Sequence, residues 1–193
     1  MSDGPVGRPI PRVEGPAKVA GLTKFCADID RPGLLWGKTF RSPFPQARIL
    51  DIDTSRAKSL PGVKAVATAQ DISPRLVGAG LKDMPVLARD RVRYVGEEIA
   101  AIAAIDAETA EEAIALIHVE YEELPAVFDV LEAMKPDAPV IHPDYASYKG
   151  PRTKAPELRN VQTLVQQGKG DIEKGFAESD HVFENVYETQ MVH

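Results

Sequence analysis

The chain has 193 residues, of which 44% are hydrophobic and 27% are charged, which is the composition of a folded globular protein. Its formal net charge of −6 argues against binding to nucleic acid or to an anionic membrane surface. No apolar run approaches the roughly 20 residues of a membrane span, and no secretory signal is expected. The single cysteine excludes an internal disulfide and fits a reducing compartment, so the sequence predicts a cytoplasmic protein.

The N-terminus is rich in proline and glycine. Residues 1–17 are predicted to form an extended arm without regular helix, because proline interrupts helical hydrogen bonding. Residues 18–30 carry enough apolar side chains, among them Phe25, to dock as a short element. Cys26 lies among these side chains, so a buried, inert thiol is expected rather than a nucleophile.

Alternating apolar and polar residues predict three strands before residue 74. The strands cover residues 34–41, 47–53 and 63–68. In the second strand, Leu50 and Ile52 are expected to share one face. A short helix, capped by Thr54 and ending at Leu60, is predicted between the second and third strands. Residues 74–91 are weakly patterned and are expected to form a loop.

The most regular part of the sequence lies between residues 92 and 127. An apolar run ends at Asp106, whose short carboxylate can cap a helix predicted over residues 107–117. The run itself, residues 98–105, fits helical spacing about as well as a buried strand. A strand is preferred, because a continuous helix would leave the cap unused. Alternation then predicts a strand over residues 118–122.

A second helix start also exists within this part of the chain. Thr109 and Glu112 have the spacing of a capping box, in which each side chain bonds the backbone of the other residue. The helix over residues 107–117 therefore has two candidate N-termini.

The C-terminal third has weaker patterns. A short helix is predicted over residues 128–134, followed by a proline-rich, extended connection over residues 136–159 that forms the best candidate domain boundary. After it, residues 160–167 are predicted as a strand, residues 171–179 as a helix, and residues 181–190 as a strand. The last strand depends on β propensity more than on alternation.

No set of residues identifies an active site. The four histidines, at positions 118, 142, 181 and 193, lie at no metal-like spacing. Gly78-Ala79-Gly80 is half of a dinucleotide fingerprint, and the segment 168–171 lacks the spacing of a phosphate loop. The arginines of residues 89–93 and the carboxylates of residues 97–98 and 120–123 are expected to be solvent-exposed. The prediction is therefore that no catalytic, cofactor-binding or metal-binding residue lies in this chain.

The order of several short sequence blocks resembles that of a known protein family. Several short blocks occur in a fixed order: Val6-Gly7, Lys18-Val19-x-Gly21, Arg41-Ser42-Pro43, Ala47-Arg48-Ile49 with Ile52-Asp53, Pro61-Gly62-Val63, Val92-Arg93-Tyr94-Val95-Gly96-Glu97, Val119-Glu120-Tyr121-Glu122 with Leu124-Pro125, and Asn160-Val161 followed by Gly170-Asp171. In this order they resemble the N-terminal part of the molybdopterin-binding subunit of the xanthine dehydrogenase and aldehyde oxidase family. One departure is Gln46, where many relatives have histidine.

The resemblance implies an α+β fold. Residues 18–135 would form an α/β hammerhead with a mixed sheet and packed helices. Residues 160–193 would form the first strand, helix and strand of a molybdenum-binding domain, after a linker over residues 136–159.

The resemblance also implies a role in an oxidoreductase that works at a molybdenum–pterin centre, with iron–sulfur clusters and FAD in the full assembly. The expected partners are a molybdenum-binding domain or subunit, an iron–sulfur subunit and an FAD subunit. The family's pterin-binding and active-site residues lie further along its chain, so this chain alone is expected to bind no cofactor and to be inactive. The alternative is a non-catalytic scaffold or interaction module that retains the hammerhead fold.

Overall fold

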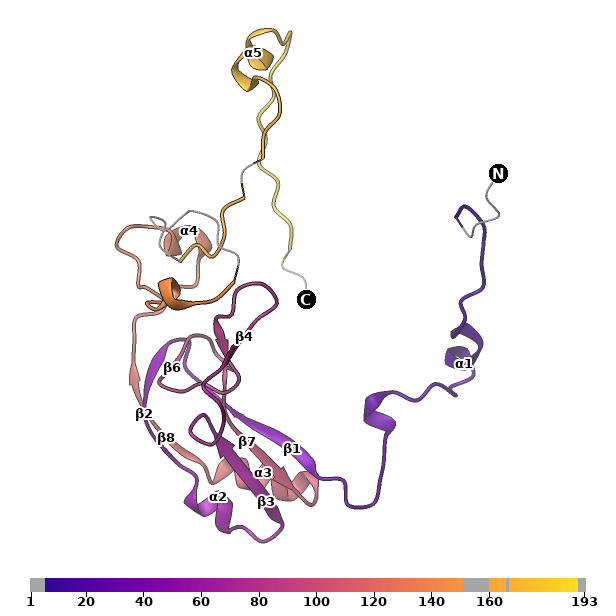
Figure 1. The fold of residues 1–193 in the computed structure, drawn as a ribbon, viewed down its shortest axis with the longest axis vertical. Coiled ribbons are helices and arrows are strands. Elements are labelled where there is room, and N and C mark those ends of the chain that lie inside the picture. Colours follow the sequence, from indigo (N-terminus) through magenta and orange to yellow (C-terminus); the bar gives the residue numbers. More distant parts are fainter. Residues whose placement is uncertain (1–5, 151–159, 166, 191–193) are drawn as a thin grey trace. The chain divides into compact units, whose positions relative to one another are not determined.

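The structure is a computed structural model that describes residues 6–150, 160–165 and 167–190. It contains two compact units, Met1–Ala126 and Val127–His193, which we call unit 1 and unit 2 (Figure 1). The domain boundaries drawn from the sequence, at residues 17, 135 and 159, stay predictions. Unit 1 combines antiparallel sheets with short helices, so the predicted α+β class is confirmed.

Two short helical elements precede the first strand of unit 1. α1 (Gly15–Val19) begins inside the predicted extended arm. Pro16 lies at one of the first two helical positions, where its missing N–H removes no hydrogen bond. The prediction of an arm without helix is therefore wrong over these residues. η1 (Cys26–Asp28) is one turn of 3-10 helix, closed by a hydrogen bond of 2.9 Å from the Phe25 N–H to the Asp28 carboxylate.

The apolar side chains of residues 18–30 are exposed, so the predicted docking of this segment is wrong. Phe25 is 61% exposed, and Val19 and Leu22 are more exposed still. Cys26 is also exposed, so the expectation of a buried thiol is wrong. Apolar composition alone indicated burial here, whereas burial requires a surface to pack against.

The first sheet of unit 1 has three antiparallel strands in the order β1-β7-β3. The strands are β1 (Trp36–Arg41), β7 (Glu98–Ala104) and β3 (Val63–Thr68). β7 is the central strand, and Ala101 lies opposite Thr39 on one side and Ala67 on the other. Both faces of β7 carry covered side chains, Ile102 buried on one face and Ala101 half-buried on the other, which explains its unbroken apolar sequence. The prediction of a strand rather than a helix over this run is confirmed.

α3 (Ala107–Ala115) begins directly after β7. The Asp106 carboxylate accepts a hydrogen bond of 2.7 Å from the Thr109 N–H, which is the predicted cap. This bond favours the ionised form and holds the pKa of Asp106 below its ordinary value. The alternative start at Thr109 is not used, because Asp106 already satisfies the first helical N–H groups.

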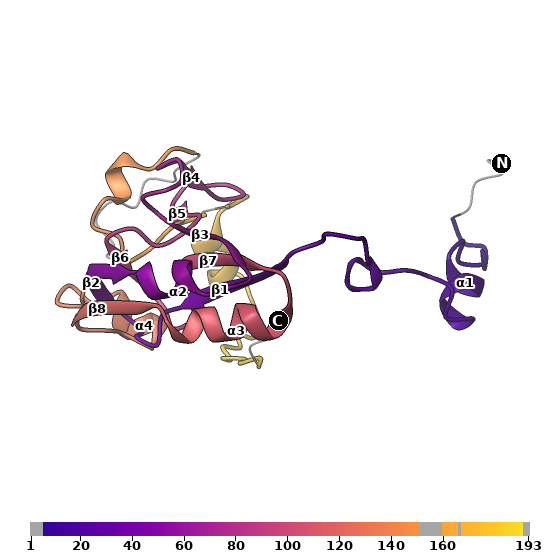
Figure 2. The ribbon, with the colours of Figure 1, turned by 90° about the horizontal axis from the view of Figure 1, so that it is seen from below.

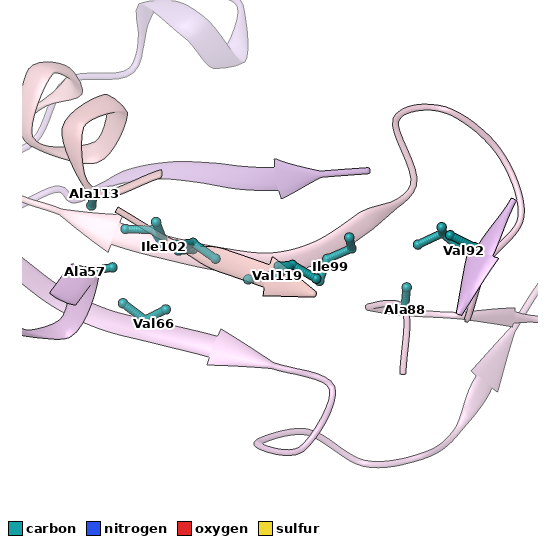
Figure 3. Packing of buried hydrophobic residues seen from close by; sticks show 11 residues of the cluster. Ala57, Val66, Ala88, Val92, Ile99, Ile102, Ala113 and Val119 are labelled. Carbon is teal, nitrogen blue, oxygen red and sulfur yellow. The ribbon is translucent and has the colours of Figure 1, made fainter. Parts of the chain in front are cut away.

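Small side chains let the helices approach the sheet closely. Ala110 and Ala113 of α3 are fully buried, and α3 contacts both β1 and β7 (Figure 2). α2 (Ser55–Ser59) packs on β3 and α3 through Ala57, which is also fully buried. Figure 3 shows Ala57 and Ala113 beside the isoleucine and valine side chains of the sheet.

α2 begins at the predicted position, but its predicted cap does not act. Thr54 occupies the N-cap position and makes no side-chain hydrogen bond to the helix. The neighbouring Asp53 carboxylate accepts from the Ser55 N–H at 2.8 Å instead. Thr54 is buried, and its hydroxyl does not bond the first N–H groups of α2. The predicted cap is therefore wrong.

The second sheet has the order β6-β2-β8, and all its pairs are antiparallel. The strands are β6 (Arg91–Val92), β2 (Ala47–Asp53) and β8 (His118–Glu123). The register of β2 against β8 shifts by one residue at Leu50, a β-bulge. Leu50 is therefore exposed, whereas Ile49 and Ile52 pack on the core. The prediction that Leu50 and Ile52 share one face of the strand is wrong.

Residues 74–91 are folded rather than a plain loop. β4 (Leu76–Val77) and β5 (Met84–Pro85) form a small antiparallel pair. Gly78 has a φ of +151°, and a Cβ at this position would lie 1.9 Å from the Leu81 carbonyl oxygen. The glycine is thus required by a tight turn, not by a nucleotide.

The core of unit 1 lies where the two sheets and helices meet. Ile99 on β7 and Val92 on β6 are its largest fully buried side chains (Figure 3). β7 and β8 are consecutive strands of the chain, linked by α3, yet they belong to different sheets. The core therefore joins the sheets through side chains rather than through one continuous ladder.

Unit 2 begins with α4 (Val130–Ala133), which confirms the short helix predicted in this region. The segment after it is not extended throughout. Ala138 and Tyr148 are buried, and η2 (Tyr145–Ser147) is a turn of 3-10 helix. Proline residues suggested a linker, but local hydrogen bonds such as Ala138 N–H to Lys135 O (3.1 Å) fold residues 136–150 into the unit. Residues 151–159 lie outside the described residues.

α5 (Ile172–Ala177) is capped by Asp171, whose carboxylate accepts from the Lys174 N–H at 3.0 Å, as its sequence predicts. The two strands predicted beside it are absent from the described residues 160–165, 167–169 and 181–190. The side chains of α5 and of residues 181–190 are exposed. A strand forms only when a neighbour satisfies its backbone, and β propensity at residues 181–190 supplied no such neighbour.

Candidate functional site

The histidines, whose spacing in the sequence argues against metal binding, do not come together among the described residues. Within the described part of the chain, no three His, Cys, Asp or Glu side chains form a metal-binding group. His118 is exposed on β8, and His142 Nδ1 lies 3.0 Å from the Tyr148 hydroxyl. His142 thus makes a local contact, and His193 lies outside the described residues.

A buried polar cluster lies in the turn of residues 93–97, which connects β6 to β7. We call it the 93–97 turn. The Glu97 carboxylate accepts a hydrogen bond of 2.5 Å from the Arg93 N–H, and its second oxygen lies 3.9 Å from the Arg93 guanidinium. Glu97 is only 5% exposed, and the Arg93 side chain is 13% exposed. Both were expected in solvent, so that part of the sequence interpretation is wrong.

Backbone bonds fasten this turn to the end of β1. The Ser42 N–H donates to the Glu97 carbonyl at 2.9 Å, and the Gly96 N–H donates to the Ser42 carbonyl at 2.8 Å. Arg41 donates to the Gly96 carbonyl and forms an ion pair of 2.8 Å with Glu98. Gly96 has a φ of +93°, which a side chain would strain. Two of the sequence blocks noted above, around Ser42 and Glu97, therefore form one structure.

Burial decides the charge state of Glu97. Desolvation raises the pKa of this carboxyl, while the hydrogen bond from the Arg93 N–H and the charge of its guanidinium lower it, and Glu98 and Asp90 raise it. The net direction is upward, because an ion pair at 3.9 Å replaces little of the lost hydration. The cluster is suited to holding a turn rigid, and it presents no nucleophile.

We expect Glu97→Gln to remove a pH dependence of stability. Because the folded-state pKa is raised, the protonated carboxyl is favoured by folding, and wild-type stability is greatest below the unfolded pKa of about 4.3. That stability is lost as the pH rises through the folded pKa, and the glutamine variant keeps it. Urea unfolding between pH 4.5 and pH 8 should show the variant gaining on the wild type as the pH rises.

Glu120→Gln is the matched control, since Glu120 is exposed on β8 and is not among the charges that shift the pKa of Glu97, so it should leave the pH dependence unchanged. A Glu97→Gln variant that loses stability relative to wild type as the pH rises would show that the pair with Arg93 outweighs desolvation.

Two buried polar atoms near this cluster have no partner in the described residues: Arg93 Nε and the Tyr121 hydroxyl. Tyr121 packs against the Phe44 ring at a centroid distance of 4.9 Å. Burial raises the pKa of Tyr121 to about 12, so the phenol stays neutral at any physiological pH.

The remaining candidate motifs have structural roles. Arg89 donates to the carbonyl of Ala69 and so closes the loop after β3. On β8, Glu122 pairs with Arg48 across the sheet at 3.0 Å, on the exposed face. The segment 168–171 supplies the Asp171 cap of α5. The sequence pattern grouped Arg93 with solvent-exposed arginines and so missed its ion pair. The signal that could have revealed the pair is the position of Arg93, a positive charge, four residues before the negative charge of Glu97.

Two surface hollows accompany these elements. One, of about 370 Å³, lies in unit 1 between α2 and the end of α3. The other, of about 400 Å³, lies in unit 2 beside α4. Each has one charged side chain in its lining, Arg56 in the first and Asp129 in the second. Neither hollow gathers the convergent polar groups of a catalytic pocket. Among the described residues, no helix has the length and apolar character needed to traverse a bilayer.

Comparison with known proteins places this chain in a family. Residues 20–125 match the family described as "Aldehyde oxidase and xanthine dehydrogenase, a/b hammerhead domain". The chain is 41% identical over 179 residues to a probable xanthine dehydrogenase component of Bacillus subtilis (strain 168), covering 92% of this chain and 22% of that protein. It is 35% identical to the "Nicotinate dehydrogenase large molybdopterin subunit" of Eubacterium barkeri, covering 92% of this chain and 39% of that protein.

Solved structures agree. The structure of "Reconstituted CO dehydrogenase from Oligotropha carboxidovorans" superposes with a TM-score of 0.63 at 40% identity, over 69% of this chain and 17% of that one. This chain therefore spans between about a fifth and two fifths of the length of the two curated relatives named above. The predicted hammerhead fold is confirmed, and the chain belongs to the aldehyde oxidase and xanthine dehydrogenase hammerhead family.

Proposed function

We propose that this chain is the N-terminal structural portion of a molybdenum hydroxylase of the xanthine dehydrogenase and aldehyde oxidase type. It supports a molybdopterin active site that another segment or subunit carries. The observation that supports this most directly is similarity over 92% of the chain to a protein named as a large molybdopterin subunit. We further propose that the assembly is cytoplasmic and that this chain alone is inactive.

The donor set of this chain does not fit the cofactors of such an assembly. An iron–sulfur cluster takes about four cysteine thiolates, whereas the sequence has one cysteine. The described residues show no phosphate-binding loop at the Gly78 turn or at the start of α5. The proposal therefore assigns the molybdenum–pterin cofactor, the iron–sulfur clusters and FAD to partner domains or subunits.

The C-terminal part of unit 2 is the proposed attachment to the molybdenum-binding portion. Phe183 is 84% exposed, and Val182, Val186 and Tyr187 are exposed with it. These are strong β-forming residues without a strand partner in the described chain. In the assembly they become a strand when the partner supplies a neighbouring one.

Amide exchange tests this proposal. Residues 160–190 should exchange rapidly in the chain alone and become protected when the molybdenum-binding portion is present, covalently continuous or separate. Phe183→Ser should weaken assembly and leave the melting of the chain alone unchanged, because the side chain is already exposed. Glu184→Ser, at the adjacent exposed residue, is the matched control.

Three results would contradict the proposal. Stoichiometric molybdenum in the chain purified alone, or substrate-dependent dye reduction by it, would show that it carries its own centre. Unchanged exchange of residues 160–190 in the presence of the molybdenum-binding portion would favour the alternative of an independent scaffold or interaction module.

A further inference from the structure

Asn160 makes an unusual set of contacts for one side chain. Its Oδ1 accepts a hydrogen bond of 2.9 Å from the Ile141 N–H. Its Nδ2 donates to the carbonyls of Ala133 (2.9 Å) and Pro139 (2.8 Å). One amide thus joins the end of α4 to residues 139–141, although it lies about twenty to thirty positions later in the sequence.

Asparagine is chemically suited to this position for two reasons. First, the backbone φ of Asn160 is +57°, in the left-handed region that asparagine tolerates better than most residues. Second, only an amide offers both an acceptor for Ile141 and two donors for the carbonyls. A rotated amide would place Nδ2 against an N–H and Oδ1 against two carbonyls, so the network itself fixes the orientation.

Asn160 and two of its partners, Ala133 and Ile141, line the unit 2 hollow of about 400 Å³. We call this hollow the α4 groove. Its lining comes from two parts of the chain, which we call its walls: residues 127–130 and 133–134 form one, and Ile141, Asn160 and Val161 form the other. The Ala133 carbonyl belongs to the last turn of α4, where carbonyls have no partner inside the helix. Asn160 supplies that partner from the opposite wall.

We propose that Asn160 is a clasp that holds the two walls of the α4 groove together. With its three bonds in place, residues 133, 139–141 and 160 move as one body. When the bonds are released, the walls separate and expose the apolar lining of the groove. This inference depends only on unit 2 and is independent of the proposed function.

Asn160→Asp tests the clasp with almost no change of shape. The introduced carboxylate keeps an acceptor for the Ile141 N–H but turns two donor contacts into repulsion between oxygen atoms. At pH 7 the protection factor of the Ile141 amide should fall roughly tenfold, the effect of about one net hydrogen bond. Fluorescence of a hydrophobic dye, 1-anilinonaphthalene-8-sulfonate, should rise as the groove opens.

Acid gives the test a second readout. Toward pH 4 the introduced carboxylate, placed against two carbonyls, takes up a proton and can donate one hydrogen bond again. Protection of Ile141 should therefore recover in part in this variant. Asn160→Gly keeps the left-handed backbone but removes the side chain, so its loss of protection should not recover with pH.

Asn185→Asp is the matched control. Asn185 is the only other asparagine, it is also followed by valine, and it is exposed in the same unit. It should change neither readout, and protected amides of β7 report in each sample that unit 1 stays folded. Unchanged Ile141 protection in Asn160→Asp, or equal effects of acid on the aspartate and glycine variants, would overturn the clasp.

Discussion

Replacing Ile99 by alanine is expected to lower the free energy of unfolding of unit 1 by about 2–5 kcal/mol. Ile99 is 0% exposed on the central strand β7, and the equally buried Val92 packs in the same cluster. The deleted methyl and methylene groups leave a cavity that close-packed neighbours fill only in part. A domain is stable by about 5–15 kcal/mol, so the loss takes a large share of that margin.

Urea unfolding followed by fluorescence of the single tryptophan, Trp36 on β1, measures this loss. Ile105→Ala is the control, because Ile105 ends the same apolar run and is 50% exposed. It should cost under about 1 kcal/mol. Equal costs at the two positions would mean that β7 is not buried as described.

Ile114→Asp is expected to unfold unit 1 or to cause its aggregation at room temperature. Ile114 is partly buried on α3 and packs against the core cluster. An unpaired carboxylate at this position costs several kcal/mol, because it would lie against apolar core side chains that cannot solvate a charge. Circular dichroism during heating would show a lost or greatly lowered transition.

Glu111→Gln on the same helix is the control for this change. Glu111 is exposed and forms an ion pair of 2.6 Å with Lys38, both side chains being open to solvent. Exposed pairs contribute about 0–1 kcal/mol, so the control should melt close to the wild type. Equal melting temperatures for the two variants would contradict the assignment of Ile114 to the buried face of α3.

The parts of the fold that could be predicted are those whose boundaries are determined by residues close together in the sequence. Asp106 separates an apolar run from a segment with helical spacing of apolar residues. The strand β7 ends just before Asp106, and the helix α3 begins just after it. Asp171 acts in the same way for α5. In both places one short carboxylate satisfies backbone groups next to it in sequence, so no tertiary information is needed.

The bulge at Leu50 shows why other features could not be predicted. One extra residue in β2 inverts the faces of every residue after it, and no local residue type announces the shift. The register depends on how β8, some seventy residues later, fits against the core. Alternation therefore identified the strand but assigned Leu50 to the wrong face.

Burial was mispredicted wherever it depends on distant partners. Cys26 and Phe25 are apolar in sequence but find no surface among the described residues to cover them. Arg93 and Glu97 are charged in sequence but are buried together, because Ser42 and Gly96 fix the turn that encloses them. The sequence blocks around Ser42 and Glu97 contain the residues of the 93–97 turn, but the sequence predicted neither its attachment to the end of β1 nor its buried ion pair.

The interleaving of strands in unit 1 has a consequence for folding during synthesis. β1 and β3 pair with β7, so the first sheet cannot close before about residue 104, and β2 pairs with β8, so the second sheet is not complete before about residue 123. Contacts this distant in sequence slow the search for the native state. On the ribosome β1 and β3 therefore emerge before their shared partner β7, and β2 emerges well before β8, so we expect the hammerhead to form late and in one cooperative step.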